Sequence, residues 1–240
     1  MKAISNNRHL LRLNRLPAFD VETVGPGKRC HILTQGCSLA CNGCMNRDTW
    51  ARRGPNGDDG LEIDPGDLAA EILMRSPEVE GLTIAGGEPL QQSDGISELL
   101  RALRASRPSL NILMYSGYRM EEIRRMGLLD VVQMVDGLVD GRYVEELAYG
   151  PGEASPRVPR GSRNQQLHLF SQEGVNVLGN GDELISSPLR LTVADVKWAR
   201  RTSSGERAVY LSGITGHCAE ISAAFVSPFL VIRQPPKQES

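Results

Sequence analysis

The pattern of apolar and polar positions predicts buried strands that alternate with amphipathic helices. Short apolar runs at 28–33, 82–85 and 110–115 are typical of buried strands. Between these runs, apolar residues recur at helical spacing in 68–73 and 96–103. Alternating strands and helices predict an α/β fold with a parallel sheet and right-handed crossovers.

Local signals indicate where several elements begin. Asp64 followed by Pro65 predicts a helix with an aspartate N-cap, and Ser93 predicts the N-cap of the next helix. Residues 120–126 are expected to be helical, and the mostly apolar stretch 131–139 predicts a further strand.

The chain is expected to have three parts, because the alternation fades after residue 171. These parts are an N-terminal arm (1–19), a core (20–171) and a C-terminal extension (172–240). Within the extension, three segments could be either strands or short helices: 173–178, 189–198 and 208–214.

Composition limits the classes of partner and the compartment. The 27 basic and 29 acidic residues give a net charge of -2, so no strong field favours nucleic acid or an anionic membrane. No apolar run approaches the roughly 20 residues that span a bilayer, and the N-terminus lacks the features of a signal peptide. Three of the five cysteines are clustered, which argues against a disulfide framework. We therefore expect a cytoplasmic protein that binds neither nucleic acid nor a membrane.

The stretch 34–46 carries Cys37, Cys41 and Cys44 in a C-x-x-x-C-x-x-C array. Three thiolates on one loop can hold three irons of a 4Fe-4S cube. The fourth iron then lacks a protein ligand and can bind a small chelating molecule, as an open catalytic metal site does.

Two other interpretations of the cysteines remain open. A tetrahedral zinc could use them if His31 or Cys30 completed the ligand set, although the chain has no second C-x-x-C pair. Cys41 and Cys44 alone could form a redox dithiol, which would leave Cys37 unexplained.

A second motif, Gly86-Gly87-Glu88-Pro89, follows the predicted strand at 82–85. Glycines let a ligand approach the backbone closely, and Glu88 offers a carboxylate. Backbone groups at this position could bind the ammonium group of an amino acid. The alternative is an ordinary strand-to-helix turn with a solvated glutamate.

Ser116, Gly117 and Tyr118 end the next predicted strand, so their hydroxyls could face the same pocket; an ordinary turn is the alternative. Asp136 interrupts an apolar stretch, where an acid is costly unless it is paired, exposed or lining a site. We expect it to contact a ribose or hydroxyl, or to be a turn residue.

Asp140 and Arg142 follow immediately in a polar segment. They either form a turn or reach the backbone of a partner protein.

Taken together, the motifs resemble those of the radical S-adenosylmethionine (SAM) enzymes. More narrowly, the chain is similar over roughly residues 20–170 to the activating protein of anaerobic ribonucleotide reductase and to pyruvate formate-lyase activase. The narrower resemblance rests on five segments: 25–30, 35–37, 44–46 with Trp50, 139–143 and 161–165.

The resemblance implies a partial (β/α)6 barrel in which Cys37, Cys41 and Cys44 ligate a 4Fe-4S cluster. Its open iron would chelate SAM, whose ammonium group would lie at Gly86, Gly87 and Glu88. Ser116 and Asp136 would lie near the carboxylate or ribose, and Gly117 and Tyr118 are further candidate cofactor contacts. Many members carry an aromatic residue where this chain has Gly43, so Met45 or Tyr118 is the candidate adenine contact.

The implied activity is reductive cleavage of SAM to a 5′-deoxyadenosyl radical that removes a hydrogen atom from a glycine of a partner glycyl-radical enzyme. Asn46, Asp140 and Arg142 are the candidate partner contacts, and a flavodoxin- or ferredoxin-type protein would supply the electron. One alternative is a radical SAM enzyme that modifies a peptide or small molecule. Another is a non-catalytic zinc or iron-sulfur protein.

Overall fold

The computed structural model describes residues 9–52, 61–75, 79–149 and 155–182, together with four short strand segments nearer the C-terminus. Among these residues, no helix combines the length and apolar character needed to cross a membrane. The predicted segment 189–198 lies outside the described residues, as does most of 208–214.

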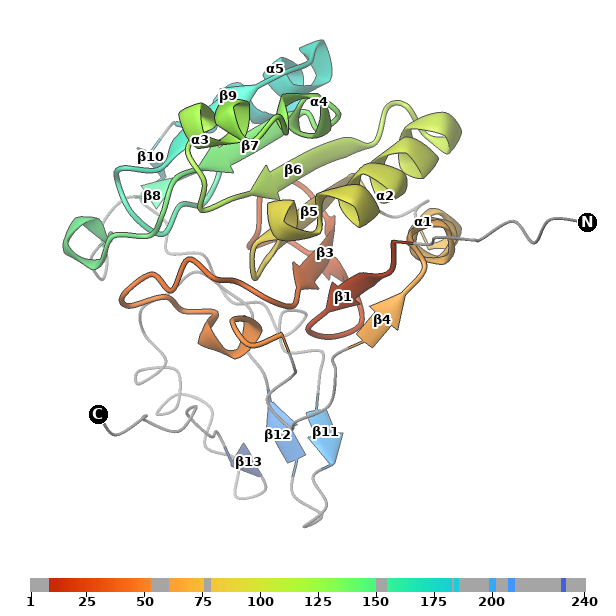
Figure 1. Cartoon of the computed structure of the whole chain (residues 1–240), viewed down its shortest axis with the longest axis horizontal. Coiled ribbons are helices and arrows are strands. Elements are labelled where there is room, and N and C mark those ends of the chain that lie inside the picture. The colour runs from red at the N-terminus through yellow and green to blue at the C-terminus, as the bar shows by residue number, and fades with distance from the viewer. Residues whose placement is uncertain are drawn as a thin grey trace, which may run out of the picture.

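The fold is built on an eight-stranded mixed sheet (Figure 1). Its centre is a parallel run of four strands in the order β3 (Arg29–Thr34), β5 (Gly81–Gly86), β6 (Asn111–Tyr115) and β7 (Gly137–Asp140). The other four strands are β1 (Leu11–Leu13), β2 (Ala18–Val21) and β4 (Leu61–Ile63), on the β3 side, and β9 (Gln166–Leu169), antiparallel to β7.

The predicted α/β fold with parallel strands is confirmed by this sheet. The parallel run of the described residues has four strands, whereas a (β/α)6 arrangement requires six. Residues 11–13, within the predicted N-terminal arm, form β1 and bury Leu11 and Leu13 completely. Closure into a partial barrel remains a prediction.

Helices cover one face of the sheet (Figure 1). They are α1 (Pro65–Met74), α2 (Ser93–Ser106), α3 (Met120–Arg125) and α4 (Leu129–Val132). Asp64 caps α1 as predicted, because its carboxylate accepts hydrogen bonds from the amides of Gly66 (2.9 Å) and Asp67 (3.3 Å).

Two predicted boundaries are wrong. A 3-10 helix, η3 (Pro89–Gln92), runs directly into α2, so Ser93 is the first helical residue and not an N-cap. Residues 131–139 do not form one strand, because α4 takes up the first part and β7 begins only at Gly137. The apolar spacing at 128–132 serves a helical turn that packs on α2.

The strands alternate their side chains between two faces. Cys30 and Ile32 of β3 lie in the large core beneath α1 to α4, whereas His31 and Leu33 border a cavity on the opposite face. On that face, α5 (Gln172–Leu178) covers β6 and β7 through a smaller apolar cluster: Leu113, Val139, Val158 and Leu178. The segment 173–178, left open by its sequence, is therefore helical.

The remaining described elements are small. They are the 3-10 helices η1 (Arg47–Thr49) and η4 (Glu145–Leu147), a two-stranded sheet of β8 (Ser155–Pro156) and β10 (Leu184–Ile185), and a three-stranded sheet of β11 (Ala199–Arg201), β12 (Arg207–Val209) and β13 (Leu230–Val231).

A buried guanidinium joins the amino-terminal ends of three strands. Arg29 is fully buried, and its Nε donates to Thr83 Oγ1 (2.7 Å) while its Nη2 donates to the Leu82 carbonyl (2.8 Å) and to Asn111 Oδ1 (2.9 Å). Burial lowers the pKa of Arg29 to about 10, which leaves it charged at neutral pH. A planar fork of donors is needed to reach all three strands at once.

We predict that Arg29→Lys lowers the free energy of unfolding by about 2–4 kcal/mol, because an ammonium group cannot reproduce the fork and leaves buried acceptors unpaired. Denaturant unfolding measures the change. Arg101→Lys on the exposed face of α2 is the matched control, with an expected change within about 0.5 kcal/mol. Equal effects of the two substitutions would contradict this role.

Candidate active site

The three cysteines lie on a loop whose two ends are held together. β3 leads into this loop, and the amides of Gly36 and Cys37 donate to the carbonyls of Thr49 (2.8 Å) and Trp50 (3.0 Å). The buried Gln35 side chain adds a bond from its Nε2 to the Ala51 carbonyl (2.6 Å). The loop is therefore closed at its neck by hydrogen bonds within the chain.

The Gly86-Gly87-Glu88 turn packs directly on the neck of the cysteine loop. The Gly87 amide donates to the Thr34 carbonyl (2.8 Å), and the Glu88 amide donates to the Gly36 carbonyl (2.9 Å). A Cβ on Gly87 would collide with the Gly36 carbonyl oxygen, and a Cβ on Gly86 would collide with the backbone of Thr34. These glycines therefore let two backbones meet, in addition to bordering the cavity.

Glu88 is buried and joins the ends of β5 and β6. Its carboxylate accepts hydrogen bonds from the hydroxyl of Ser116 (2.9 Å), the amide of Gly117 (2.7 Å) and the amide of Leu90 (3.0 Å). Burial raises the pKa of Glu88 to about 7, although these three donors oppose the rise. These bonds bring Glu88, Ser116 and Gly117 together, and their contact with a cofactor stays a prediction.

Two glutamines beside this turn hold the cysteine loop, and sequence reasoning missed both. Gln91 Nε2 donates to Ser38 Oγ (2.7 Å), and Gln91 Oε1 accepts from the Ser38 amide (3.2 Å). Gln92 Nε2 donates to the carbonyls of Arg12 (3.1 Å) and Gln35 (3.2 Å). The available signal was their place just beyond the Gly-Gly-Glu-Pro motif, from which only Leu90 separates them.

The far wall of the site comes from residues 141–165. Gln165 Nε2 donates to the Gly141 carbonyl (2.9 Å), and its Oε1 accepts from the Gly161 amide (2.8 Å). Gly43 has a positive φ of 73°, and a Cβ there would press against Tyr143. The motifs at 139–143 and 161–165, which carried the resemblance without an assigned role, thus bind each other beside the cysteine loop.

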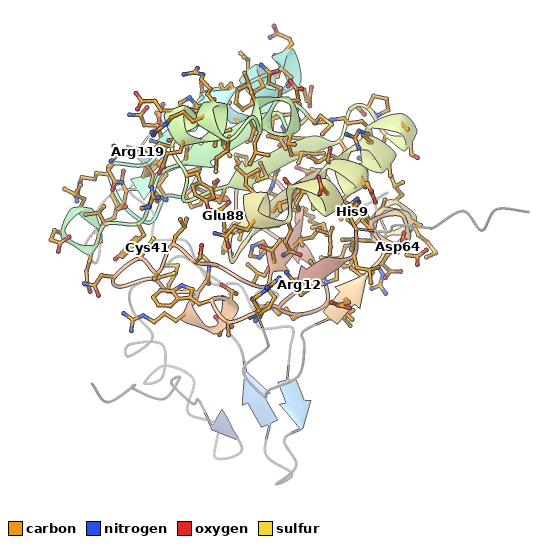
Figure 2. All side chains as sticks on the ribbon, viewed as in Figure 1. His9, Arg12, Cys41, Asp64, Glu88 and Arg119 are labelled. Carbon is orange, nitrogen blue, oxygen red and sulfur yellow. The ribbon has the colours of Figure 1, made fainter. Side chains whose placement is uncertain are left out.

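A cavity of about 300 Å³ lies between these segments. Cys41 and Glu88 lie on neighbouring loops at the same end of the sheet (Figure 2). The predicted site residues that line the cavity are Cys37, Cys41, Cys44, Met45, Asn46, Gly86, Gly87, Glu88, Ser116 and Gly117.

The donor set fits a 4Fe-4S cluster. All three cysteines are free and half-buried, and desolvation raises the pKa of the thiols of Cys37 and Cys41. Each cysteine of a cube binds a separate iron, so three thiolates spread along one loop suffice.

A zinc site does not fit the same residues. Within the described residues, no three His, Cys, Asp or Glu side chains converge to hold a single ion. Cys30 faces the opposite side of β3, where burial raises its pKa to about 12. His31 does line the cavity, but tetrahedral coordination requires four convergent ligands.

Two predicted acidic site residues have partners within the fold. Asp136 lies at the amino end of β7, where it pairs with Arg104 (2.8 Å) and accepts from the Ile112 amide (2.7 Å). Asp140 is buried, and its carboxylate accepts from the Met120 amide (2.8 Å) at the start of α3. Neither residue is in the cavity lining, and the ribose contact of Asp136 and the partner contact of Asp140 stay predictions.

Tyr118 and Arg142 lie outside the cavity lining. The hydroxyl of Tyr118 accepts from Gln91 Nε2 (2.9 Å), and its ring lies under the Arg142 guanidinium, 5.8 Å from the ring centroid. Arg142 also pairs with both oxygens of Glu122 (2.7 and 3.0 Å), which lowers the pKa of Glu122 to about 2. Met45, 47% exposed at the rim, is the candidate adenine contact that lines the cavity.

His31, Leu33 and Ala85 also line the cavity. His31 is only 8% exposed. Burial, helped by the charges of Arg15 and Arg29, lowers its pKa to about 3. Its imidazole is therefore neutral at physiological pH.

Comparison with known proteins identifies the class. A family described as a 4Fe-4S single cluster domain matches residues 23–168. The anaerobic ribonucleoside-triphosphate reductase-activating protein of Enterobacteria phage T4 is 34% identical over 145 residues, which cover 60% of this chain and 85% of that protein. The protein of the same name from Escherichia coli K12 is 30% identical over 146 residues (60% and 90%), and that from Haemophilus influenzae is 29% identical over 164 residues (66% and 99%).

This chain belongs to the radical SAM family, in the branch of the anaerobic ribonucleoside-triphosphate reductase-activating proteins. The crystal structure of QueE from Escherichia coli is also similar, with a TM-score of 0.37 and 18% identity over 45% of this chain and 53% of that one. A likeness at this level supports no conclusion about function.

We predict that Gly87→Ala reduces the iron bound after anaerobic reconstitution, because its Cβ would push the Gly36 carbonyl and the adjoining Cys37 away. The strain should also cost about 1–3 kcal/mol of stability. Gly127→Ala is the control: Gly127 has a φ of 70° and open space around it, so this change should cost about 1 kcal/mol and leave iron binding intact. Normal iron content in Gly87→Ala would refute the contact as a determinant of cluster binding.

We predict that His31 destabilises the cluster-free protein in acid. Because its folded pKa of about 3 lies below the unfolded value of 6.5, its contribution is complete above pH 6.5 and is lost as the pH falls toward 3. At pH 4 the loss should be on the order of 3 kcal/mol. His31→Phe lacks this titration, so unfolding free energies of the two proteins should diverge below pH 6.5. Parallel pH profiles would contradict the burial of a neutral imidazole.

Proposed function

We propose that the protein is a glycyl-radical activase that cleaves SAM reductively at a 4Fe-4S cluster held by Cys37, Cys41 and Cys44. Its substrate would be a glycine of a partner enzyme of the anaerobic ribonucleotide reductase type. The observation that carries the proposal is the single cavity shared by the three thiols and the Gly86-Gly87-Glu88 turn. The named relatives, which are reductase-activating proteins, support the choice of partner.

The residues of this chain would bind and orient the reactants. When bound, the cluster and SAM supply the one-electron cleavage of the sulfonium and the radical that removes a hydrogen atom. The backbone of Gly86 and Gly87 would receive the ammonium group of SAM. Glu88 would hold Ser116 and Gly117 at the cavity wall, because both residues follow β6 and donate to its carboxylate.

Other parts of the chain would serve the partners. Asn46 and Arg142 remain candidate contacts with the reductase. Asn46 lines the cavity, and the side chain of Arg142 is 40% exposed. An external flavodoxin- or ferredoxin-type donor would supply the electron in the cytoplasm.

We also propose that the parallel sheet forms part of an open barrel around the cavity. The core of residues 20–171 would carry the chemistry, with residues 1–19 as an arm and residues 172–240 as an extension. The cavity lies over the carboxyl ends of β3, β5 and β6, which supports the proposal that the core carries the chemistry.

We predict that the anaerobically reconstituted protein, with SAM, a reductant and an anaerobic ribonucleotide reductase, produces a glycyl-radical doublet in the electron paramagnetic resonance spectrum. Cys37→Ala, Cys41→Ala and Cys44→Ala should each reduce 5′-deoxyadenosine formation to background and lower the bound iron, because each removes one of three anchors. Cys30→Ala, which removes a thiol on the other face of β3, should keep both.

The outcomes separate the candidate functions. Formation of 5′-deoxyadenosine without a radical on the reductase would favour modification of another peptide or a small molecule. Full turnover in any of the three cysteine variants would refute the cluster assignment.

A further inference from the structure

His31 lines the cavity with an imidazole that forms no hydrogen bond among the described residues. The residue is 8% exposed, and the charges of Arg15 and Arg29 act on its ring. A buried polar group left unpaired costs about 1–3 kcal/mol, which a ligand that enters the cavity could recover.

The cavity lining around His31 is partly apolar and includes Val24, Leu33 and Ala85. Two hydroxyls of the lining already donate to carbonyls, that of Thr83 to Val24 (3.0 Å) and that of Tyr115 to Pro159 (2.8 Å). Arg15 also lines the cavity, so a ligand beside His31 meets apolar side chains, a neutral imidazole and a guanidinium.

The position of His31 separates it from the cysteines. It precedes Leu33 by two residues on β3, which places it about 7 Å deeper along the strand, whereas Cys37 follows the end of β3. The Gly86-Gly87-Glu88 turn also lies at the strand end. His31 thus faces the space beneath the part of the cavity that the cofactor residues border.

The protonation state of His31 narrows the chemistry of its ligand. With a pKa of about 3, the ring is neutral and carries one N–H donor and one nitrogen acceptor. A carboxylate offers only acceptors and an ammonium group only donors. A peptide unit offers both a C=O and an N–H, which match the donor and the acceptor of the neutral ring.

We propose that His31 binds a peptide amide of the polypeptide segment that enters the cavity, and that it thereby helps to select the substrate. This inference rests on the proposed function, which requires a glycine of a partner protein to reach the same cavity.

The test uses the reconstituted full chain and fluorescently labelled peptides that carry the target-glycine segment of an anaerobic ribonucleotide reductase. One peptide is unmodified, and three others carry a single N-methyl group on the glycine amide or on one of its two neighbours. Fluorescence anisotropy measures each affinity for the wild type, His31→Phe and His31→Gln. The affinity for SAM is measured in parallel for all three proteins.

The wild type should bind one N-methylated peptide about 5-fold more weakly than the unmodified peptide, as expected for one hydrogen bond. His31→Phe should bind the unmodified peptide about 5-fold more weakly and should lose the discrimination. His31→Gln, which also carries one acceptor and an N–H donor group, should recover part of it. If His31 had only a structural role, His31→Phe would not change the ratio of the affinities for the unmodified and N-methylated peptides.

Three results would overturn the inference. They are equal discrimination by His31→Phe and the wild type, no binding of any peptide by the wild type, and a loss of SAM affinity in His31→Phe as large as the loss of peptide affinity. If His31→Phe fails to fold, the comparison of wild type with His31→Gln decides. The glycyl radical formed on the intact reductase by the wild type tests the proposed function separately.

Discussion

The site depends on a close contact between two backbones, the turn after β5 and the neck of the cysteine loop after β3. Glu88 and Gly87 donate their amides to the carbonyls of Gly36 and Thr34, and no side chain can stand between them. Parallel strands bring their carboxyl ends to one edge of a sheet, and here the two loops are joined there by hydrogen bonds. The cysteine loop is consequently held by the same motif that borders the proposed SAM site.

Side-chain amides and one carboxylate extend this contact to the rest of the cavity wall. Glu88 fixes the end of β6, Gln91 and Gln92 hold the cysteine loop, and Gln165 ties the segments on the far side. Most of these hydrogen bonds join a side chain to a backbone group. Such a bond fixes the path of the backbone as well as the position of the side chain. A cavity whose walls are fixed in this way can orient reactants without reorganising, which is what a protein contributes to cofactor chemistry.

Much of the core could be predicted from the sequence because its signals are local. The apolar runs of β3, β5 and β6, the cap at Asp64 and the spacing of the cysteines each depend on a few adjacent residues. Ser93 and residues 131–139 were misassigned because short turns of helix interrupt patterns that look continuous. The contacts of Asp136 and Asp140 could not be predicted from the sequence, because their partners, Arg104 and the Met120 amide, are 32 and 20 residues away. The hydrogen bonds of Gln165 and the place of His31 in the cavity lining could not be predicted either, because both depend on what the fold brings beside them.

The central claim is that three protein thiolates hold a cubane cluster and leave one iron for SAM. Mössbauer spectroscopy of the anaerobically reconstituted, iron-57-labelled protein tests it most directly. The account predicts that SAM changes the spectrum of one iron in four, the one without a cysteine, and leaves the other three as they were. Four irons that are all unaffected by SAM, or a protein that retains zinc in place of the cluster, would contradict the account.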